Sequence, residues 1–453
     1  GTDPDTRRWL ADAIVVVDPC LNPDGRQRYV SWYRSIASAR PDPDPAPVEH
    51  APPWPGGRTN HYWFDLNRDW TWLTQVETRT RIEAYRRFEP HVHVDAHEMS
   101  FESSTFFFPA ARPFHALIPR HVRDRAKAFG DGNAAAYDRR GWAYYTEETF
   151  DLFYPGYGDS WPSLRGGVGM TYEQAGGGEA GRAVRRSDGR ILTLAERIDR
   201  HRVASLATID TACRNRRGML ADFHRFRKAS LAAPSPGETR AWLLPPGEDP
   251  STTTHLVATL VRQGVEVRRA TSAFYLERVR DASGTERAPA VFEAGTWIVP
   301  AAQPVGTLAR SLLEPKPRIP EAKFYDISAW SLPYSFGVEA FQATTDPEVA
   351  ADAVTEPPRA EGKVEGGPAR YAYLVPWPQR GGPRLLYRLL AEGFRGRATV
   401  EPFRIGATEY RPGTAIFLTG DNPSSLHERM ATIAADCGVR VAAVDGGRTQ
   451  ARV

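Results

Sequence analysis

Short apolar runs alternate with longer stretches of helical spacing in the first half of the chain. Residues 14–17 form an apolar, β-branched run that predicts a strand. Two prolines and a glycine in residues 18–25 predict that this strand ends there and is followed by a loop. The proline-rich residues 41–55 predict an ordered surface loop, and the aromatic residues 61–64 predict a second short strand.

Three segments have the spacing expected of helices that cover a sheet. Apolar positions recur at helical intervals in residues 72–88, 116–137 and 192–219. Residues 90–94 predict a strand that leads into the polar sequence at 95–98. Strands and helices that alternate in this way predict an α/β fold with a mixed sheet flanked by helices.

The character of the chain changes after about Pro234, where candidate catalytic residues become rare while strand and helix signals continue. The stretch from Thr355 to Pro368 is charged and rich in proline and glycine, which is typical of a linker. We therefore expect a catalytic domain over residues 1–233, an α/β module over 234–354, a linker over 355–369 and a further α/β module over 370–453. A length of 453 residues is ample for several domains of ordinary size.

Charge and composition exclude several kinds of partner. The 58 basic and 55 acidic residues leave a net charge of +3 and are spread along the chain, so no concentrated basic field could hold nucleic acid or an anionic membrane. No apolar run reaches the roughly 18 residues of a membrane-spanning helix. The abundance of Arg, Ala and Pro is typical of a GC-rich bacterial genome. We therefore expect neither a nucleic acid nor a membrane as a partner.

The three cysteines, Cys20, Cys213 and Cys437, lie far apart in the chain. Their odd number and the lack of CxxC spacing argue against a disulfide framework and a cysteine zinc site, and we expect buried thiols. Cys437 also lacks the small-residue elbow that surrounds a nucleophile. A binding or packing role is therefore expected for the C-terminal modules.

Four polar clusters stand beside apolar strand signals, where a purely structural sequence rarely places them. They are NPDG at residues 22–25, DLNR at 65–68, DAHE at 95–98 and TYEQ at 171–174. Each is weak alone, since NPDG is most often a turn. In this order and spacing they resemble the zinc metallocarboxypeptidase family of the carboxypeptidase A type, over roughly residues 10–180.

The resemblance implies a zinc-dependent peptidase that removes C-terminal residues from peptides with a free C-terminus. It assigns His97 as a zinc ligand and Glu173 as the general base for water. It also assigns Asp65 as a carboxylate that orients a zinc-bound histidine. Residues 97–101 lack the second histidine of an HExxH motif, which argues against a thermolysin-type site.

Asn67 and Arg68 match the family's pair that binds the terminal carboxylate, for which the planar fork of arginine is suited. A tyrosine that closes over the substrate is assigned to Tyr154, and Tyr157 is nearly as good a candidate.

The arginine that polarises the scissile carbonyl lies in the family after NPDG and close to a tryptophan. Arg28 and Arg34 flank Trp32, and spacing does not decide between them. Arg58 is a third candidate.

The family's first zinc motif, HxxE, is absent from the 21 residues that precede Asn22. Since a catalytic zinc site normally uses three protein ligands, His97 alone is not expected to bind zinc tightly or to support activity. We expect the motif to lie upstream of residue 1, where a signal peptide of a secreted or periplasmic protein would also lie. The alternative is a metal-free relative.

Two further functions stay open. One is an amide deacylase or peptidoglycan amidase on the same scaffold, which needs no free carboxylate. The other is a metal-free module that binds peptides or glycans. Side-chain specificity and oligomeric state are left open by the sequence.

Overall fold

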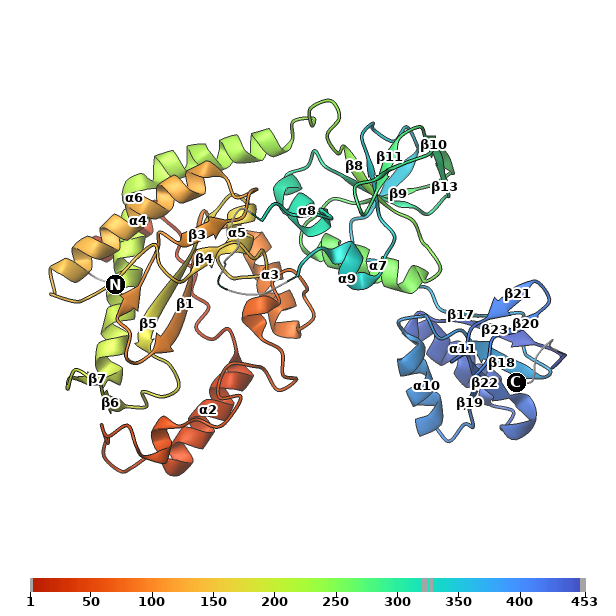
Figure 1. Ribbon diagram of the computed structural model, residues 1–453, viewed down its shortest axis with the longest axis horizontal. Helices are drawn as coiled ribbons and strands as arrows, with labels where there is room; N and C mark the ends of the chain where they lie inside the picture. Colours follow the sequence, from red (N-terminus) through yellow and green to blue (C-terminus); the bar gives the residue numbers. More distant parts are fainter. Residues whose placement is uncertain (1–2, 320–324, 326–328, 449–453) are drawn as a thin grey trace. The chain divides into compact units, whose positions relative to one another are not determined.

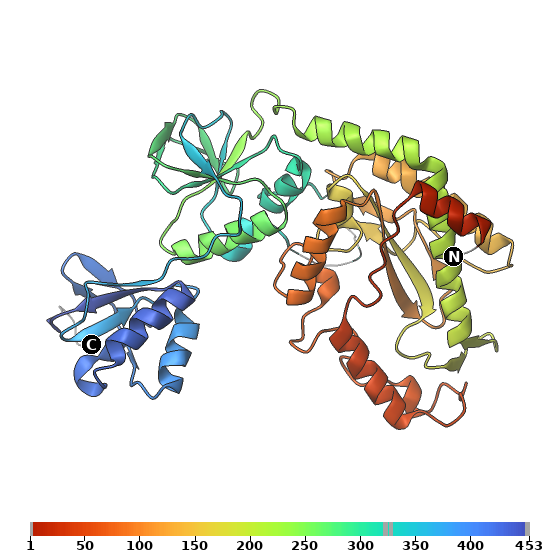
Figure 2. The same cartoon turned by 180° about the vertical axis from the view of Figure 1, so that it is seen from behind.

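A computed structural model describes residues 3–319, 325 and 329–448, and the chain forms two compact units (Figures 1 and 2). Unit 1 comprises Gly1–Pro234, Arg262–Val265 and Ala301–Ser331, and unit 2 comprises the remainder. Both units are mixed α/β, which confirms the predicted fold class at this level. The segment Ala301–Ser331, which the sequence analysis placed in the second module, belongs to unit 1.

The central sheet of unit 1 has the strand order β1-β5-β2 and mixed direction. β1 (Val92–Ser100) and β5 (Val168–Gly176) run parallel, with Val92 paired to Val168 and Ser100 to Gly176. β2 (Thr105–Phe106) pairs antiparallel with the other side of β5. Every residue of β5 is buried, as expected for a central strand that is covered on both faces.

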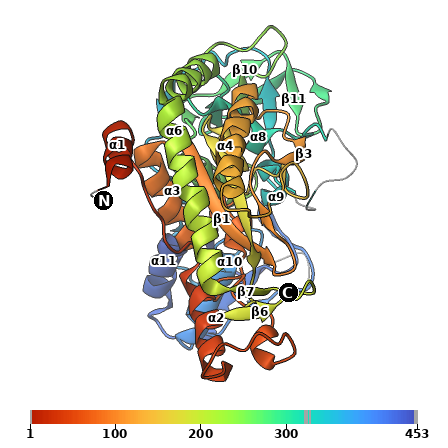
Figure 3. The same ribbon diagram turned by 90° about the vertical axis from the view of Figure 1, so that its left-hand side faces the viewer.

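Helices cover this sheet at the places that the apolar spacing predicts. α4 (Arg120–Asp138) and α6 (Leu194–Ser230) lie side by side and contact β5 (Figure 3). α3 (Val76–Phe88) precedes β1. The three predicted helices are thus confirmed with shifted ends, and α4 begins after Pro119 because proline has no backbone N–H to donate.

Three local predictions were wrong. Residues 14–17 are exposed and form no strand, and residues 61–64 form a turn. The segment 18–25 is not a plain loop, because α2 (Pro23–Ile36) starts within it. Pro23 occupies the first helical turn, and Asn22 caps the helix by accepting a hydrogen bond from the Gly25 amide.

Smaller elements complete unit 1. They are α1 (Pro4–Asp12), η1 (Val48–His50), η2 (Leu66–Arg68), α5 (Ser160–Leu164), α8 (Gly306–Leu313), the strand pair β3 (Ala111–Phe114) and β4 (Asp151–Leu152), and the strand pair β6 (Ala183–Arg185) and β7 (Ile191–Thr193).

Unit 2 contains a seven-stranded antiparallel sheet in the order β12-β11-β15-β8-β14-β9-β16. Its strands are β8 (Ala241–Leu244), β9 (Arg268–Ala270), β11 (Val279–Asp281), β12 (Glu286–Arg287), β14 (Trp297–Pro300), β15 (Phe341–Ala343) and β16 (Ala351–Ala353). The unit also contains α7 (Pro250–Arg262), α9 (Leu332–Phe336) and the pair β10 (Phe274–Leu276) and β13 (Ala290–Phe292).

A second sheet of unit 2 has the order β17-β23-β18-β22-β19. Its elements are β17 (Lys363–Glu365), β18 (Ala372–Val375), β19 (Arg397–Ala398), β22 (Ala415–Leu418) and β23 (Arg440–Val444), with α10 (Gly382–Ala391), η3 (Thr419–Asp421), α11 (Leu426–Cys437) and the hairpin β20 (Phe403–Ile405) and β21 (Thr408–Tyr410). Alternate residues of β18 face two cores, with Val375 on the side of α10 and α11 and Leu374 on the side of the hairpin. β17 lies within the stretch expected to be a linker.

Of the three cysteines, Cys213 is buried and the other two are half-buried, and none forms a disulfide. Across residues 3–319, 325 and 329–448, no helix is long and apolar enough to cross a bilayer.

We predict that Gly169→Ala destabilises unit 1 by about 1–3 kcal/mol, because an added methyl overpacks a tight contact. A Cβ at Gly169 would lie 2.0 Å from the carbonyl oxygen of Asp159, so β5 and the start of α5 would have to separate. Thermal and urea unfolding would measure the change. Gly420→Ala is the control, since its methyl meets no atom within 4 Å, and equal stability of the two variants would contradict the prediction.

Candidate functional site

The register of β1 and β5 places four polar side chains on one face of the sheet. Asp95 is paired with Thr171, and His97 with Glu173. Because successive side chains of a strand point to opposite faces, residues two apart share a face. These groups lie in the middle of two parallel strands, β1 and β5.

One pocket of unit 1 brings together the substrate-facing and proton-transferring residues predicted from the sequence. Asn67, Arg68, His97 and Glu173 all line it, although they come from η2, β1 and β5. The remaining lining residues are Arg58, Phe150, Asp151, Tyr157, Asp159, Thr171 and Tyr325. Polar and charged groups therefore dominate this pocket.

His97 forms an ion pair with a buried carboxylate. Its Nε2 lies 2.9 Å from Oδ2 of Asp95, and the Asp95 side chain is 3% exposed. Burial lowers the pKa of His97, but the charge and hydrogen bond of Asp95 outweigh it and raise that pKa to about 9. Burial alone would raise the pKa of Asp95, and His97 brings it down to about 2. The pair is thus ionised at neutral pH.

Glu173 has the properties of a proton acceptor at neutral pH. Burial raises its pKa, His97 opposes that rise, Asp95 adds to it, and the result is about 7. Its Oε2 atom is buried without a hydrogen-bond partner among the described residues. A carboxyl group with a pKa near the working pH is suited to general acid–base chemistry.

Asp159 is a further carboxyl group of the pocket, which Asp151 also lines. It caps α5 by accepting from the Ser160 amide at 2.6 Å, and its Oδ2 accepts from the Thr171 hydroxyl at 2.7 Å. Burial raises the pKa of Asp159 to about 6 against the effect of the Thr171 hydrogen bond.

Arg68 and Asn67 are held in defined orientations. The Arg68 guanidinium lies 4.5 Å from the centre of the Tyr157 ring. Asn67 accepts a hydrogen bond from the Gly158 amide at 3.2 Å, and its Nδ2 lies 3.2 Å from Nε2 of His97.

Asp65, expected to orient a histidine, instead pairs with arginines. Its Oδ2 accepts from Nε of Arg58 at 2.9 Å and lies 3.9 Å from Nη1 of Arg68. Its Oδ1 accepts from the Asn67 amide and caps η2. Asp65 therefore orients the two arginines of the pocket.

The structure brings Arg58 into the pocket, and not Arg28 or Arg34. Arg28 donates to backbone carbonyls of residues 56–60, and Arg34 is exposed in the last turn of α2. Spacing along the chain favoured these two because both flank Trp32. The weaker third candidate, Arg58, is carried on the loop that leads into η2 and so reaches the site.

Tyr154 is buried behind the pocket and does not line it. Its hydroxyl accepts from the Trp72 indole at 2.8 Å and donates to the carbonyl oxygen of Arg68 at 3.1 Å. Tyr154 therefore supports the backbone of η2, whereas Tyr157, the alternative tyrosine, lines the pocket.

The residues of this site do not fit a zinc ion. Among the described residues, no group of three His, Cys, Asp or Glu side chains is arranged to hold a metal, and catalytic zinc normally takes three protein ligands. Nε2 of His97, one of its two possible donors, is paired with Asp95. The groups present provide charge, hydrogen bonds and proton transfer.

Sequence reasoning missed several residues at or beside the site, among them Phe150, Asp151 and Tyr325 of the pocket lining. Asp95 carried a signal, because it stands two positions before His97 on a predicted strand and must share its face. Asp159 had no signal in the sequence. His201 of α6, whose Nε2 lies 3.1 Å from the His97 carbonyl oxygen, also had none.

Comparison with protein-family models, curated proteins and solved structures gave no match.

We predict that Asp95→Asn lowers the pKa of His97 from about 9, because the charge and hydrogen bond of Asp95 that raise it are lost while the opposing effect of burial remains. Histidine titration by NMR would measure this change. In the wild-type protein the folded state binds the His97 proton more tightly than the unfolded state. The resulting contribution to the free energy of unfolding is fully present below pH 6.5 and is lost as the pH rises through about 9. The variant should lose that dependence.

Asp131→Asn is a matched control, because Asp131 forms an exposed pair with Lys127 on α4. It should leave the His97 titration unchanged. A pKa of His97 that stays near 9 in Asp95→Asn would show that another group sets it.

Proposed function

We propose that unit 1 acts on peptides in the manner of a metallocarboxypeptidase, binding the C-terminal residue and hydrolysing its amide bond. The observation that carries this proposal is that a candidate carboxylate-binding pair, Asn67 and Arg68, lines the same pocket as the candidate base Glu173. The mixed sheet flanked by helices agrees with the fold of that family.

Recognition of a free carboxylate suits the oriented guanidinium of Arg68. A planar guanidinium can donate two parallel hydrogen bonds to a carboxylate. The contacts of Arg68 with the Tyr157 ring and with Asp65 restrict its orientation before any ligand binds, which lowers the entropy lost on binding.

In the proposed hydrolysis, Glu173 removes a proton from the water that attacks the scissile carbonyl carbon. The carbon–nitrogen bond then breaks, and Glu173 returns the proton to the leaving amine. Arg58, the other arginine that lines the pocket beside Arg68, would stabilise the negative charge on the carbonyl oxygen.

The zinc that the family resemblance implies is not accounted for by these residues. His97 is the one histidine that lines the pocket in the described part of the chain, and no step above is assigned to a metal. A module that binds peptides or glycans without a metal is the second candidate function, and the Asp95–His97 ion pair favours it, because that pair satisfies His97 without a cation.

We predict that Arg68→Ala lowers the affinity for an N-acylated dipeptide with a free C-terminus by about 10- to 100-fold, the loss of roughly 1.5–3 kcal/mol from a charge-assisted contact. The affinity for the same dipeptide with an amidated C-terminus should not change. Isothermal titration calorimetry on the full chain would measure both.

Arg120→Ala is the control, since Arg120 is an exposed residue of α4. Equal losses for the acid and the amide would argue against recognition of a terminal carboxylate, and would favour the deacylase or amidase alternative.

We also predict that the purified 453-residue chain holds less than stoichiometric zinc and shows no zinc-stimulated peptide hydrolysis. The reason is that the described residues offer His97 without two further ligands. Metal analysis by mass spectrometry with His97→Ala as the comparison would test this, because stoichiometric zinc that is lost in the variant would contradict it.

A further inference from the structure

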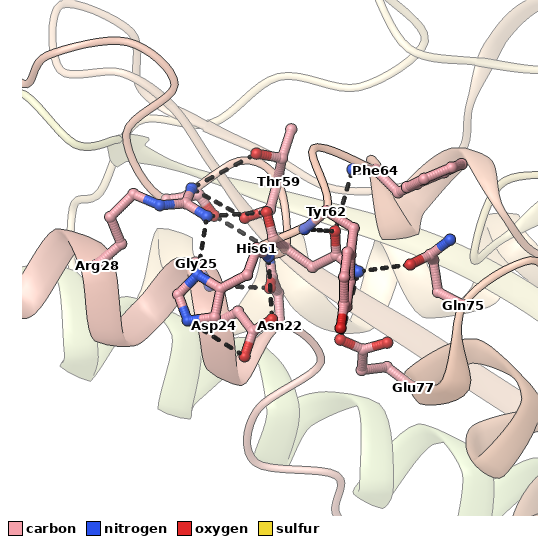
Figure 4. Close-up of polar contacts among 12 residues, drawn as sticks. Asn22, Asp24, Gly25, Arg28, Thr59, His61, Tyr62, Phe64, Gln75 and Glu77 are labelled. Atoms are coloured by element: carbon pink, nitrogen blue, oxygen red, sulfur yellow. Dashed lines mark hydrogen bonds and ion pairs between the residues drawn. The ribbon is translucent and has the colours of Figure 1, made fainter. Parts of the chain in front are cut away.

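The loop that carries Arg58 is held by the first turns of α2 (Figure 4). Nη1 of Arg28 donates to the carbonyl oxygens of Gly56 and Thr59, each at 3.1 Å. Nη2 of Arg28 donates to the Asn60 carbonyl oxygen at 2.8 Å. The same guanidinium lies 5.4 Å from the centre of the Trp63 ring. One side chain therefore holds both ends of the segment 56–60.

The NPDG residues add three contacts to the same loop. The Asn22 amide group donates to the carbonyl oxygens of Gly57 and Arg58, each at 3.2 Å. Asp24 accepts a hydrogen bond from the His61 amide at 3.0 Å. Gly25 allows the close approach, because a Cβ there would lie 2.1 Å from the Gly57 carbonyl oxygen.

The far side of the loop is fixed by a buried asparagine. Asn60 is fully buried, and its Oδ1 accepts from the amides of Tyr62 and Phe64, each at 3.0 Å. Its Nδ2 donates to Gln75, just before α3, at 2.8 Å. These contacts hold Trp63 at a φ of 66°, which is rare for a bulky residue and persists only where the surroundings fix it.

The chemistry of these contacts indicates a conformational role for Arg28. An arginine at a protein surface commonly pairs with a carboxylate. The described hydrogen bonds of Arg28 go mainly to backbone carbonyl oxygens instead. Charge-assisted bonds of this kind are roughly twice as strong as neutral ones. The backbone carbonyl of Arg58 is itself held by Asn22, while its side chain pairs with Asp65 at 2.8 Å and lines the pocket.

We propose that Arg28 is a positioning residue, which together with Asn22 fixes the loop 56–64 so that Arg58 is presented to the carbonyl group of the bound peptide. The role of Arg58 towards the peptide rests on the proposed function. The clamp on the loop does not, and it is measured separately.

The first experiment follows Arg58 itself without any ligand. Phenylglyoxal labelling of the full chain, read by peptide mass spectrometry, should be roughly 3- to 10-fold faster at Arg58 in Arg28→Ala, because a loosened loop breaks its pairing with Asp65. Asn22→Ser should act in the same direction, since serine keeps the helix cap but removes the amide donors. Arg34→Ala, an exposed arginine on the same helix, is the control.

Unchanged labelling of Arg58 in both Arg28→Ala and Asn22→Ser would overturn the proposal. If Arg28→Ala fails to fold, as judged by circular dichroism, Asn22→Ser still decides it, because its helix cap is intact.

The second experiment is a double-mutant cycle on the binding of the N-acylated dipeptide. Arg58→Ala should weaken binding about tenfold and Arg28→Ala about 3- to 10-fold, while the double variant should bind within about twofold of Arg58→Ala alone. Additive losses would show that Arg28 does not act through Arg58. Absence of peptide binding by the wild-type chain would refute the proposed function, and the labelling result would still stand for the clamp.

Discussion

The parallel pairing of β1 with β5 is the constraint on which the rest of the site depends. It sets Asp95 beside Thr171 and His97 beside Glu173, and a slip of one residue would turn each of these side chains to the opposite face. Burial of the whole of β5 fixes that register, because the slip would also exchange the apolar residues that contact the two faces. Apolar packing therefore determines where the charges of the pocket meet.

The buried carboxyl groups of Asp95, Asp159 and Glu173 lie near the imidazole of His97, and the charges of these groups give them different pKa values. Asp95, closest to His97, keeps its negative charge. Glu173 receives only part of that stabilisation, so burial and the charge of Asp95 raise its pKa to about 7. Asp159, which accepts a hydrogen bond from Thr171, has a pKa of about 6, which is between the pKa values of Asp95 and Glu173. A divergence of this kind allows one carboxyl group to carry a proton while another stays ionised.

Elements that depend on neighbouring residues could be predicted from the sequence, whereas contacts between residues far apart in the chain could not. The start of β1 was predicted as a strand at residues 90–94, and α3, α4 and α6 as periodic segments, whereas β5 was not predicted as an element. α2 was missed because NPDG was interpreted as a turn, although Asn22 and Pro23 are equally typical of a helix start. The aromatic run at 61–64 resembled a strand but is fixed as a turn by Asn60 and Arg28. Which of Arg28, Arg34 and Arg58 lines the pocket depends on which loop folds back to the sheet. The spacing of these residues along the chain does not indicate this.

The substrate-facing half of the pocket owes its arrangement to protein contacts alone. Asp65 orients Arg58 and Arg68, Tyr154 supports the η2 backbone, and Gly158 fixes the Asn67 amide. These contacts come from three separate segments, so the side chains of the pocket are oriented in the absence of any ligand. Under the proposed function, binding of a C-terminal residue would need only the groups described, whereas hydrolysis of its amide bond would also require activation of a water molecule by Glu173.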